Sequence, residues 1–193
     1  DWHVLPDMIT CGKAIGSGYA PLGAVIISEK IAGFFREGRR RFVHGFTYSG
    51  HAMSCFVGQK VFEIMQREDL FNRPGRIGVY LHERLGALQQ RHEIIGDLRG
   101  RGLYAGLEFV SDRASRAPFP EATRFTPRLV SMMRERGVIV GGGVPDANFG
   151  KGGDHIQISP PFTISEAEID ILVDALDDVL TVLGSETASL ATE

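Results

Sequence analysis

Cysteine is scarce in this sequence, because only Cys11 and Cys55 occur among its 193 residues. Two thiols are too few for the usual four-ligand structural zinc site, and such low usage is typical of a reducing compartment where thiols stay free. Histidine, aspartate and glutamate form no cluster with metal-site spacing, so His51 and His155 are interpreted as hydrogen-bonded structural residues. We therefore expect a cytoplasmic protein with no disulfide and no metal site.

Long apolar runs and a strong charge of either sign are also missing. No stretch is long enough to span a bilayer, and no basic segment followed by an apolar one marks a secretory signal, so we expect no membrane partner. The formal net charge is -3, and the basic run Arg39–Arg41 is better explained by a solvated helix end or loop than by a nucleic-acid patch. We therefore expect no nucleic-acid partner.

An initiator methionine is absent as well. The chain opens on Asp1-Trp2-His3-Val4 and enters a strand-like segment almost at once. This opening suggests a fragment of a longer polypeptide, although processing to a mature form would look the same.

Strand and helix patterns alternate along the chain and predict the α/β class. The expected strands are 8–10, 24–27, 41–46, 103–110, 138–140 and 155–159. The expected helices are 28–35, 51–67, 77–91, 126–136 and a long one after Ser165, with a frayed tail from Ser185. A compositional break near 69–75 predicts a boundary between residues 1–70, part of a mainly parallel sheet, and residues 71–193, a smaller α+β unit.

Lys13 follows the first expected strand and opens a glycine-rich loop. Apolar neighbours such as Ile9 and Ile15 would favour the neutral, nucleophilic amine that a Schiff-base lysine needs. Glycines on both sides would let the backbone approach a flat cofactor closely. On this local pattern alone, however, an ordinary exposed loop lysine is the better interpretation.

The longer string around Lys13 changes that balance. The run CGKAIGSGYAPLGAVIIS resembles the lysine signature of the class III aminotransferases, a branch of the fold-type I enzymes that use pyridoxal 5'-phosphate (PLP). The matching positions are Lys13, Ile15, Gly16, Gly18, Pro21, Leu22, Gly23 and Ala24. The resemblance implies that Lys13 is the catalytic lysine and holds PLP as a Schiff base. It makes residues 1–70 the C-terminal part of the large PLP-binding domain and 71–193 the small C-terminal domain.

A second segment, His44-Gly45-Phe46-Thr47-Tyr48-Ser49-Gly50-His51, resembles the stretch that follows the lysine strand in the same family. There the threonine hydroxyl and adjacent backbone bind the cofactor phosphate across a dimer interface. The resemblance therefore implies that Phe46 and Thr47 bind the cofactor of a neighbouring subunit, in a homodimer or higher homo-oligomer. A hydroxyl and backbone N–H groups are suitable donors to a phosphate dianion.

Two further segments carry the resemblance to about residue 183. Residues 97–103 resemble the start of the family's small domain, where Arg99 and Arg101 are better suited to structural salt bridges than to a site. Residues 153–162 resemble the strand near the substrate entrance, and Gln157 stands where many relatives place a carboxylate-binding arginine. Relatives that act on omega-amino acids and amines carry a mobile arginine shortly before the Gly-Asp pair instead. Lys151 lies in that region here and could substitute as a point charge, or equally be a solvated loop lysine. Gln157 and Lys151 are therefore the candidate substrate residues.

The implied activity is a ping-pong transamination from an amine or omega-amino acid to an oxo acid such as pyruvate. Lys13 would act as base and acid in the proton shift. The resemblance also implies that an aspartate, an aromatic residue and a phosphate-binding turn lie upstream, in a missing N-terminal half, so that this chain alone would not turn over substrate. The alternatives are an aminomutase or decarboxylating relative on the same scaffold, or an inactive truncated scaffold.

Overall fold

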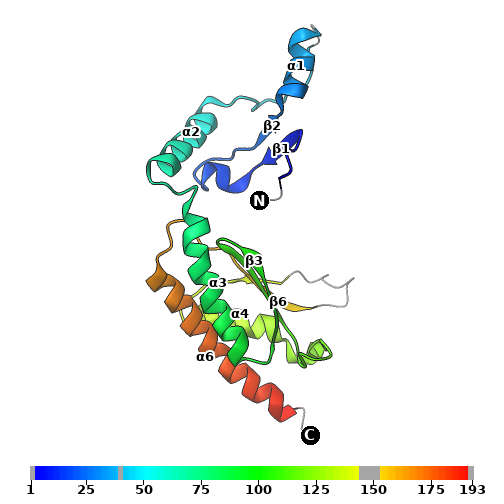
Figure 1. Ribbon diagram of the computed structural model, residues 1–193, viewed down its shortest axis with the longest axis vertical. Helices are drawn as coiled ribbons and strands as arrows, with labels where there is room; N and C mark the ends of the chain where they lie inside the picture. Colours follow the sequence, from blue (N-terminus) through cyan, green and yellow to red (C-terminus); the bar gives the residue numbers. More distant parts are fainter. Residues whose placement is uncertain (1–2, 39–40, 144–152, 191–193) are drawn as a thin grey trace. The chain divides into compact units, whose positions relative to one another are not determined.

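The computed structural model describes residues 3–38, 41–143 and 153–190, and the chain divides into two compact units, Asp1–Asp69 and Leu70–Glu193. Figure 1 shows the elements of each unit, coloured along the sequence. Each unit is mixed α/β, and the strand pairs of both are antiparallel. Within the described residues, no helix combines the length and the apolar character needed to cross a membrane.

The first unit consists of two strands and two helices around short turns. It contains β1 (Met8–Cys11), the 3₁₀ turn η1 (Lys13–Gly16), β2 (Ala24–Ile27), α1 (Glu29–Glu37) and α2 (Ala52–Arg67). The two strands pair antiparallel from Met8↔Ile27 to Cys11↔Ala24, so no parallel pair occurs among the described residues of this unit. The β-branched run of β2 favours a strand, as expected.

Two expectations for this unit were wrong. Residues 41–46 form no strand, because no described strand lies beside them to complete a hydrogen-bonded ladder. The strands β1 and β2 exist. The continuous apolar run 24–27 is typical of a strand buried on both faces, but β2 is not buried in this chain: Val25 is 64% exposed and Ile26 is 55% exposed. Both thiols, Cys11 and Cys55, are free.

The second unit is a four-stranded antiparallel sheet covered by helices. Its elements are α3 (Arg73–Arg91), β3 (Ile95–Arg101), β4 (Tyr104–Phe109), η2 (Glu121–Thr123), α4 (Phe125–Glu135), β5 (Gly141–Gly142), β6 (Asp154–Ile158) and α6 (Glu166–Leu190). The strand order is β3-β4-β6-β5. Burial alternates along β4, so Ala105, Leu107 and Phe109 face the helices and the residues between them face away.

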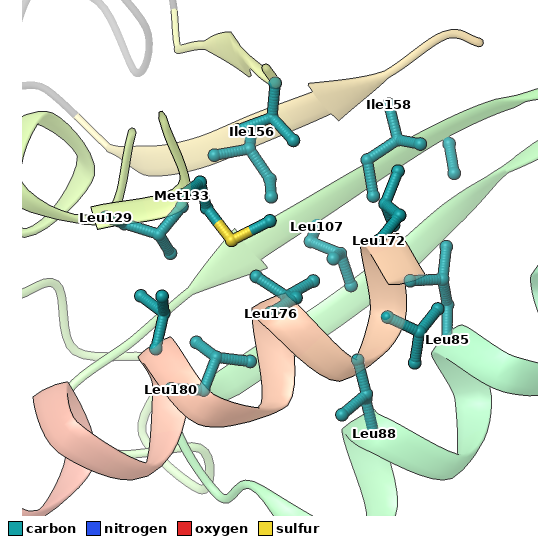
Figure 2. Close-up of a cluster of buried hydrophobic side chains, with 14 of the residues drawn as sticks. Leu85, Leu88, Leu107, Leu129, Met133, Ile156, Ile158, Leu172, Leu176 and Leu180 are labelled. Carbon is teal, nitrogen blue, oxygen red and sulfur yellow. The ribbon is translucent and has the colours of Figure 1, made fainter. Parts of the chain in front are cut away.

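The hydrophobic core lies between this sheet and the helices α3, α4 and α6. Figure 2 shows Leu172, Leu176 and Leu180 of α6 beside Leu85 and Leu88 of α3, close to side chains of the sheet and of α4. These side chains recur at helical spacing, which places them on one face of each helix. Every buried hydrophobic side chain among the described residues belongs to this second unit.

Three local expectations for the second unit need correction. Helix α3 begins at Arg73 rather than at 77, because Pro74 is tolerated in the first helical turn, where its missing N–H has no intrahelical partner. Strand β3, which continues through Gly100 to Arg101, was not among the expected strands. Residues 138–140 are not a strand, and the short β5 is Gly141–Gly142 instead.

The N-terminus of α6 is closed by hydrogen bonds between Ser165 and Glu168, at the point where the sequence predicted a long helix to begin. The Ser165 backbone N–H donates to Glu168 Oε2 at 2.8 Å, and the Glu168 N–H donates back to Ser165 Oγ at 3.2 Å. This reciprocal pair is a capping box. The helix continues to Leu190, so the tail expected to fray from Ser185 is helical for several residues beyond it.

Candidate active site

Lys13 lies where strand β1 ends and the turn η1 begins. Its backbone adopts φ 53°, in the left-handed region that side-chain-bearing residues avoid at a cost of about 1–2 kcal/mol. Ser17 (φ 48°) and Gly18 (φ 77°) are left-handed as well, so the loop concentrates unusual backbone conformations within six residues of Lys13. Such strain is commonly retained at functional sites.

The Lys13 amine is exposed within this chain. Among the described residues it has no hydrogen-bond or ion-pair partner, whereas Lys30 in the same unit pairs with Asp7 at 3.5 Å. The desolvation suggested by the sequence is not supplied by this chain, because Ile9 is itself 44% exposed and Ile15 is only half-buried. The amine is therefore free to react, but the chain alone does not enclose it.

Helix α2 supports the Lys13 turn through Gly58, which is buried. A Cβ atom at Gly58 would lie 2.3 Å from Leu22 Cδ2 and 4.0 Å from the carbonyl oxygen of Ile15. The bare glycine face thus lets α2 approach the loop that contains Lys13. The sequence did not single out Gly58, and only its place within an otherwise regular helical pattern could have marked it.

Thr47 lies in the turn that leads into the same helix. The Ser49 N–H donates to the Phe46 carbonyl at 2.9 Å, and the His51 N–H donates to the Tyr48 carbonyl at 3.1 Å. His51 then caps α2, since its Nδ1 accepts from the Ser54 N–H at 3.3 Å, which gives His51 the structural role expected of it. The Thr47 side chain is exposed at this helix entrance.

Gln157 lies in the second unit, in the middle of β6. Its neighbours along the strand, Ile156 and Ile158, are buried, so Gln157 is on the face of the sheet opposite the core. Its partners on the adjacent strands are Gly106 and Gly141, neither of which carries a side chain. The Gln157 amide therefore stands between two bare positions, a feature that only the strand register reveals.

Arg99 lies in the same row across the sheet, opposite Gly106. Its guanidinium donates to Asp97 and, at 2.6 Å, to Glu108 Oε2. The hydrogen bond to Glu108, together with that to Asp97, raises the pKa of Arg99 above its usual value. These contacts agree with the structural salt bridges that the sequence favoured for this arginine. Lys151, the other candidate substrate residue, lies outside the described residues.

The side chains present fit part of a PLP site. Lys13 offers a primary amine for the cofactor aldehyde, and the Thr47 hydroxyl and adjacent N–H groups are suitable donors to a phosphate. No acceptor among the described residues occupies the Lys13 amine, so no existing interaction must be broken. The cavity of about 760 Å³ described in Leu70–Glu193 is lined by residues such as Ile94, Phe119 and Leu180, and by none of the predicted site residues.

Comparison with known proteins shows the family to which this chain is similar. The family model for class-III aminotransferases matches residues 1–180. The mitochondrial alanine–glyoxylate aminotransferase 2 homolog 2 of Arabidopsis thaliana is 39% identical over 91% of this chain, which covers 34% of that relative.

Solved structures extend the likeness to the fold. An (S)-enantioselective omega-transaminase from Thermomicrobium roseum matches 93% of this chain with a TM-score of 0.81 and 38% identity, over 38% of its own length. An amine transaminase from an uncultivated Pseudomonas species, in its PLP-bound form, matches 95% with a TM-score of 0.82 and 34% identity, over 40% of its own length. The chain thus has the fold of the C-terminal part of a fold-type I enzyme and spans well under half of these relatives. It belongs to the class-III aminotransferase family.

Proposed function

We propose that this chain is the C-terminal part of a PLP-dependent transaminase in which Lys13 holds the cofactor covalently as a Schiff base. The observation that carries the proposal is Lys13 itself, a left-handed, exposed lysine without a partner among the described residues, at the end of β1. PLP as the cofactor is supported by the amine transaminase from an uncultivated Pseudomonas species, which was solved in its PLP-bound form and is similar over 95% of this chain. Asp1–Asp69 would then be the end of the large cofactor-binding domain and Leu70–Glu193 the small domain.

The chain's own residues have distinct roles in this proposal. PLP, when bound, supplies an electron sink for the carbanion that forms at the substrate carbon. Once a donor amine has displaced it from the cofactor, Lys13 Nζ would take the proton from that carbon and donate it at the other end of the 1,3-proton shift, which requires an amine that is not held by a salt bridge. The Thr47 hydroxyl and the backbone beside Phe46 donate to the phosphate, on the neighbouring subunit of a homodimer.

Gln157 would set part of the substrate preference. A neutral amide offers two N–H donors and a carbonyl acceptor, but it cannot form the charged, forked contact that arginine makes with a carboxylate. Its bare neighbours Gly106 and Gly141 leave space on both sides for a substrate group. This arrangement favours amines or omega-amino acids as donors, with pyruvate as an acceptor. The similar enzyme from Thermomicrobium roseum is described as an omega-transaminase, which supports this class of donor.

The test of the cofactor anchor is a reduction experiment on the full-length polypeptide that contains this chain, in a cytoplasmic expression host. After incubation with PLP, borohydride should fix the cofactor to Lys13 in the wild type, as read from the mass of the tryptic peptide. Lys13→Ala should lose the label and the visible absorbance of the bound cofactor. Lys30→Ala is the matched control, since Lys30 is an exposed lysine of the same unit that is already paired with Asp7.

Two outcomes would contradict the proposal. A label on another lysine would assign the anchor elsewhere, and a wild-type protein that takes up no label would support the inactive-scaffold alternative. A panel of donors with pyruvate then tests the substrate class. Activity with α-amino acids alone would make the omega-amine assignment wrong, and rearranged or decarboxylated products would point to the other class III chemistries.

A further inference from the structure

Residues 41–46 connect α1 to the turn that carries Thr47, and they do so without regular secondary structure. Within the described part of the chain, residues 41–45 make no backbone–backbone hydrogen bond, whereas the Phe46 carbonyl already belongs to the Thr47 turn. A segment without a hydrogen-bonded ladder keeps its conformational freedom unless side chains restrict it. The side chains are therefore where the order of this segment must come from.

A series of aromatic rings runs along the segment. The ring centroids of Phe35 and Phe42 are 5.6 Å apart at 82°, those of Phe42 and His44 are 5.9 Å apart at 64°, and those of His44 and Phe46 are 6.4 Å apart at 57°. All three separations fall in the range of about 4.5–7 Å in which edge-to-face and tilted ring pairs attract one another. We call Phe35, Phe42, His44 and Phe46 the aromatic ladder.

The spacing of the ladder follows from the sequence. Residues 42, 44 and 46 alternate, and in an extended chain alternate side chains point to the same side and are about 6.4–6.8 Å apart. The ring separations of 5.9 and 6.4 Å are close to this repeat. Val43, between the rings, makes no ring contact and is 91% exposed.

Each end of the ladder is attached to an ordered element. Phe35 is a half-buried residue of helix α1 and also packs edge-on against Phe34 at 5.6 Å. At the other end, the Phe46 carbonyl accepts from the Ser49 N–H and so closes the turn that contains Thr47. The ladder therefore links a helix to the position of the Thr47 hydroxyl.

We propose that the aromatic ladder is a positioning device for Thr47, and that Phe42 and His44 are positioning residues for the phosphate group of the cofactor. This inference rests on the proposed function, in which Thr47 binds that phosphate. Phe42 and His44 do not touch the cofactor in this account. They lower the number of conformations from which the Thr47 turn must be selected when the phosphate binds.

The test uses the full-length polypeptide, freed of PLP, and a matched set of variants at an exposed position. His44→Ala removes one ring from the ladder, His44→Phe keeps a ring, and Val43→Ala removes a neighbouring side chain that lies outside the ladder. The first readout is hydrogen exchange of the 46–51 amides without cofactor. We expect faster exchange in His44→Ala and parental exchange in the other two.

The second readout is the dissociation constant of PLP, measured by absorbance titration. Loss of two ring contacts should weaken PLP binding by about threefold to tenfold in His44→Ala, while His44→Phe stays within about twofold of the parent. In a Thr47→Val background the same His44→Ala change should have little further effect, because the ladder acts through Thr47. Full additivity of the two substitutions would overturn the proposal.

The two proposals fail in different ways. If borohydride labels Lys13 but His44→Ala leaves both exchange and PLP affinity unchanged, the ladder does not position Thr47 and the proposed function stands. If Lys13 is not labelled, the proposed function is wrong, and unchanged exchange in the cofactor-free protein would independently refute the ladder.

Discussion

Leu70–Glu193 buries a continuous apolar cluster between a sheet and three helices, whereas Asp1–Asp69 buries no large apolar side chain among its described residues. The first unit nevertheless carries many large apolar side chains. Leu5, Val25, Met53 and Phe56 are all exposed, as are both faces of the β1–β2 pair. The two units therefore differ in whether their large hydrophobic side chains are buried.

This difference separates stability from the candidate chemistry. The predicted cofactor residues, Lys13, Phe46 and Thr47, lie in the unit that has no core of its own, while the core belongs to the unit that holds Gln157. Folding of a small unit depends on the apolar area that it removes from water. We therefore expect the first unit to depend on further polypeptide for its stability, consistent with relatives of which this chain covers 34–40%.

The largest expected effect follows from producing the two units separately. Residues 70–193 should fold alone and unfold cooperatively, with a free energy of unfolding on the order of 5 kcal/mol, because their core is complete. Residues 1–69 should show neither dispersed amide resonances nor a cooperative transition in urea. Circular dichroism and proton–nitrogen NMR spectra of both fragments measure this.

The intact chain is the control for that experiment, with each fragment compared at the same concentration. A cooperative transition in residues 1–69, independent of protein concentration, would show that the exposed side chains of this unit do not limit its stability. The distinction between the two units would then be lost.

The helices were predictable from the local spacing of apolar residues, whereas the burial of side chains in each unit was not. The sequence predicted α2 and the apolar faces of α3 and α6, because helical periodicity is encoded within a few turns. It also predicted β1 from a short apolar segment and β2 from its β-branched run. It did not predict that Val25 would be exposed, because burial depends on which surface lies opposite. Residues 41–46 have strand composition but no partner, and pairing is a non-local property.

The candidate site divides in the same way. Lys13 was recognisable because its signature is contiguous, and the fixed glycine and proline spacing carries most of the information. The two glycines beside Gln157 could not be recognised from the sequence, because Gly106 and Gly141 lie next to Gln157 only through the register of the strands. The aromatic ladder was visible in principle, as alternate aromatic residues at 42, 44 and 46, but its attachment to Phe35 required the fold.

Replacing either of two glycines in α3 by alanine should have the next largest effect on the free energy of unfolding. The sign of this effect should differ between the two positions. A Cβ atom at Gly78 would lie 2.5 Å from the Cα and carbonyl carbon of Gly102, which are backbone atoms that cannot move aside. A Cβ atom at Gly86 would meet nothing within 4 Å. Gly78→Ala should therefore destabilise residues 70–193 by about 1–3 kcal/mol, while Gly86→Ala should stabilise them by up to about 1 kcal/mol.

Urea denaturation of both variants measures the change. Gly58→Ala extends the comparison to the first unit, and it is measured in the full-length polypeptide, on which we expect this unit to depend for its stability. There the new Cβ would lie 2.3 Å from Leu22 Cδ2, the end of a flexible side chain in a unit without a packed core. Leu22 can rotate away, so the loss should be smaller than at Gly78. Equal losses at Gly58 and Gly78 would mean that the first unit is packed as tightly as the second.

The smallest expected effect concerns the acid stability of the second unit through Glu168. The Ser165 backbone N–H, and then its hydroxyl, donate to this carboxylate and lower its pKa below the ordinary value of 4.5. A carboxyl whose pKa is lower in the folded state stabilises that state above the unfolded pKa, and the contribution disappears as pH falls through the folded pKa. Glu168→Gln should therefore destabilise residues 70–193 at pH 7 and cost progressively less below about pH 4.5.

Glu166→Gln is the control in the same helical turn, since Glu166 makes no capping hydrogen bond. In urea denaturation between pH 3 and 7, the change in unfolding free energy caused by Glu166→Gln should depend less on pH than the change caused by Glu168→Gln. A Glu168→Gln difference that does not shrink on acidification would mean that the capping box contributes through geometry alone, rather than through the charge of the carboxylate.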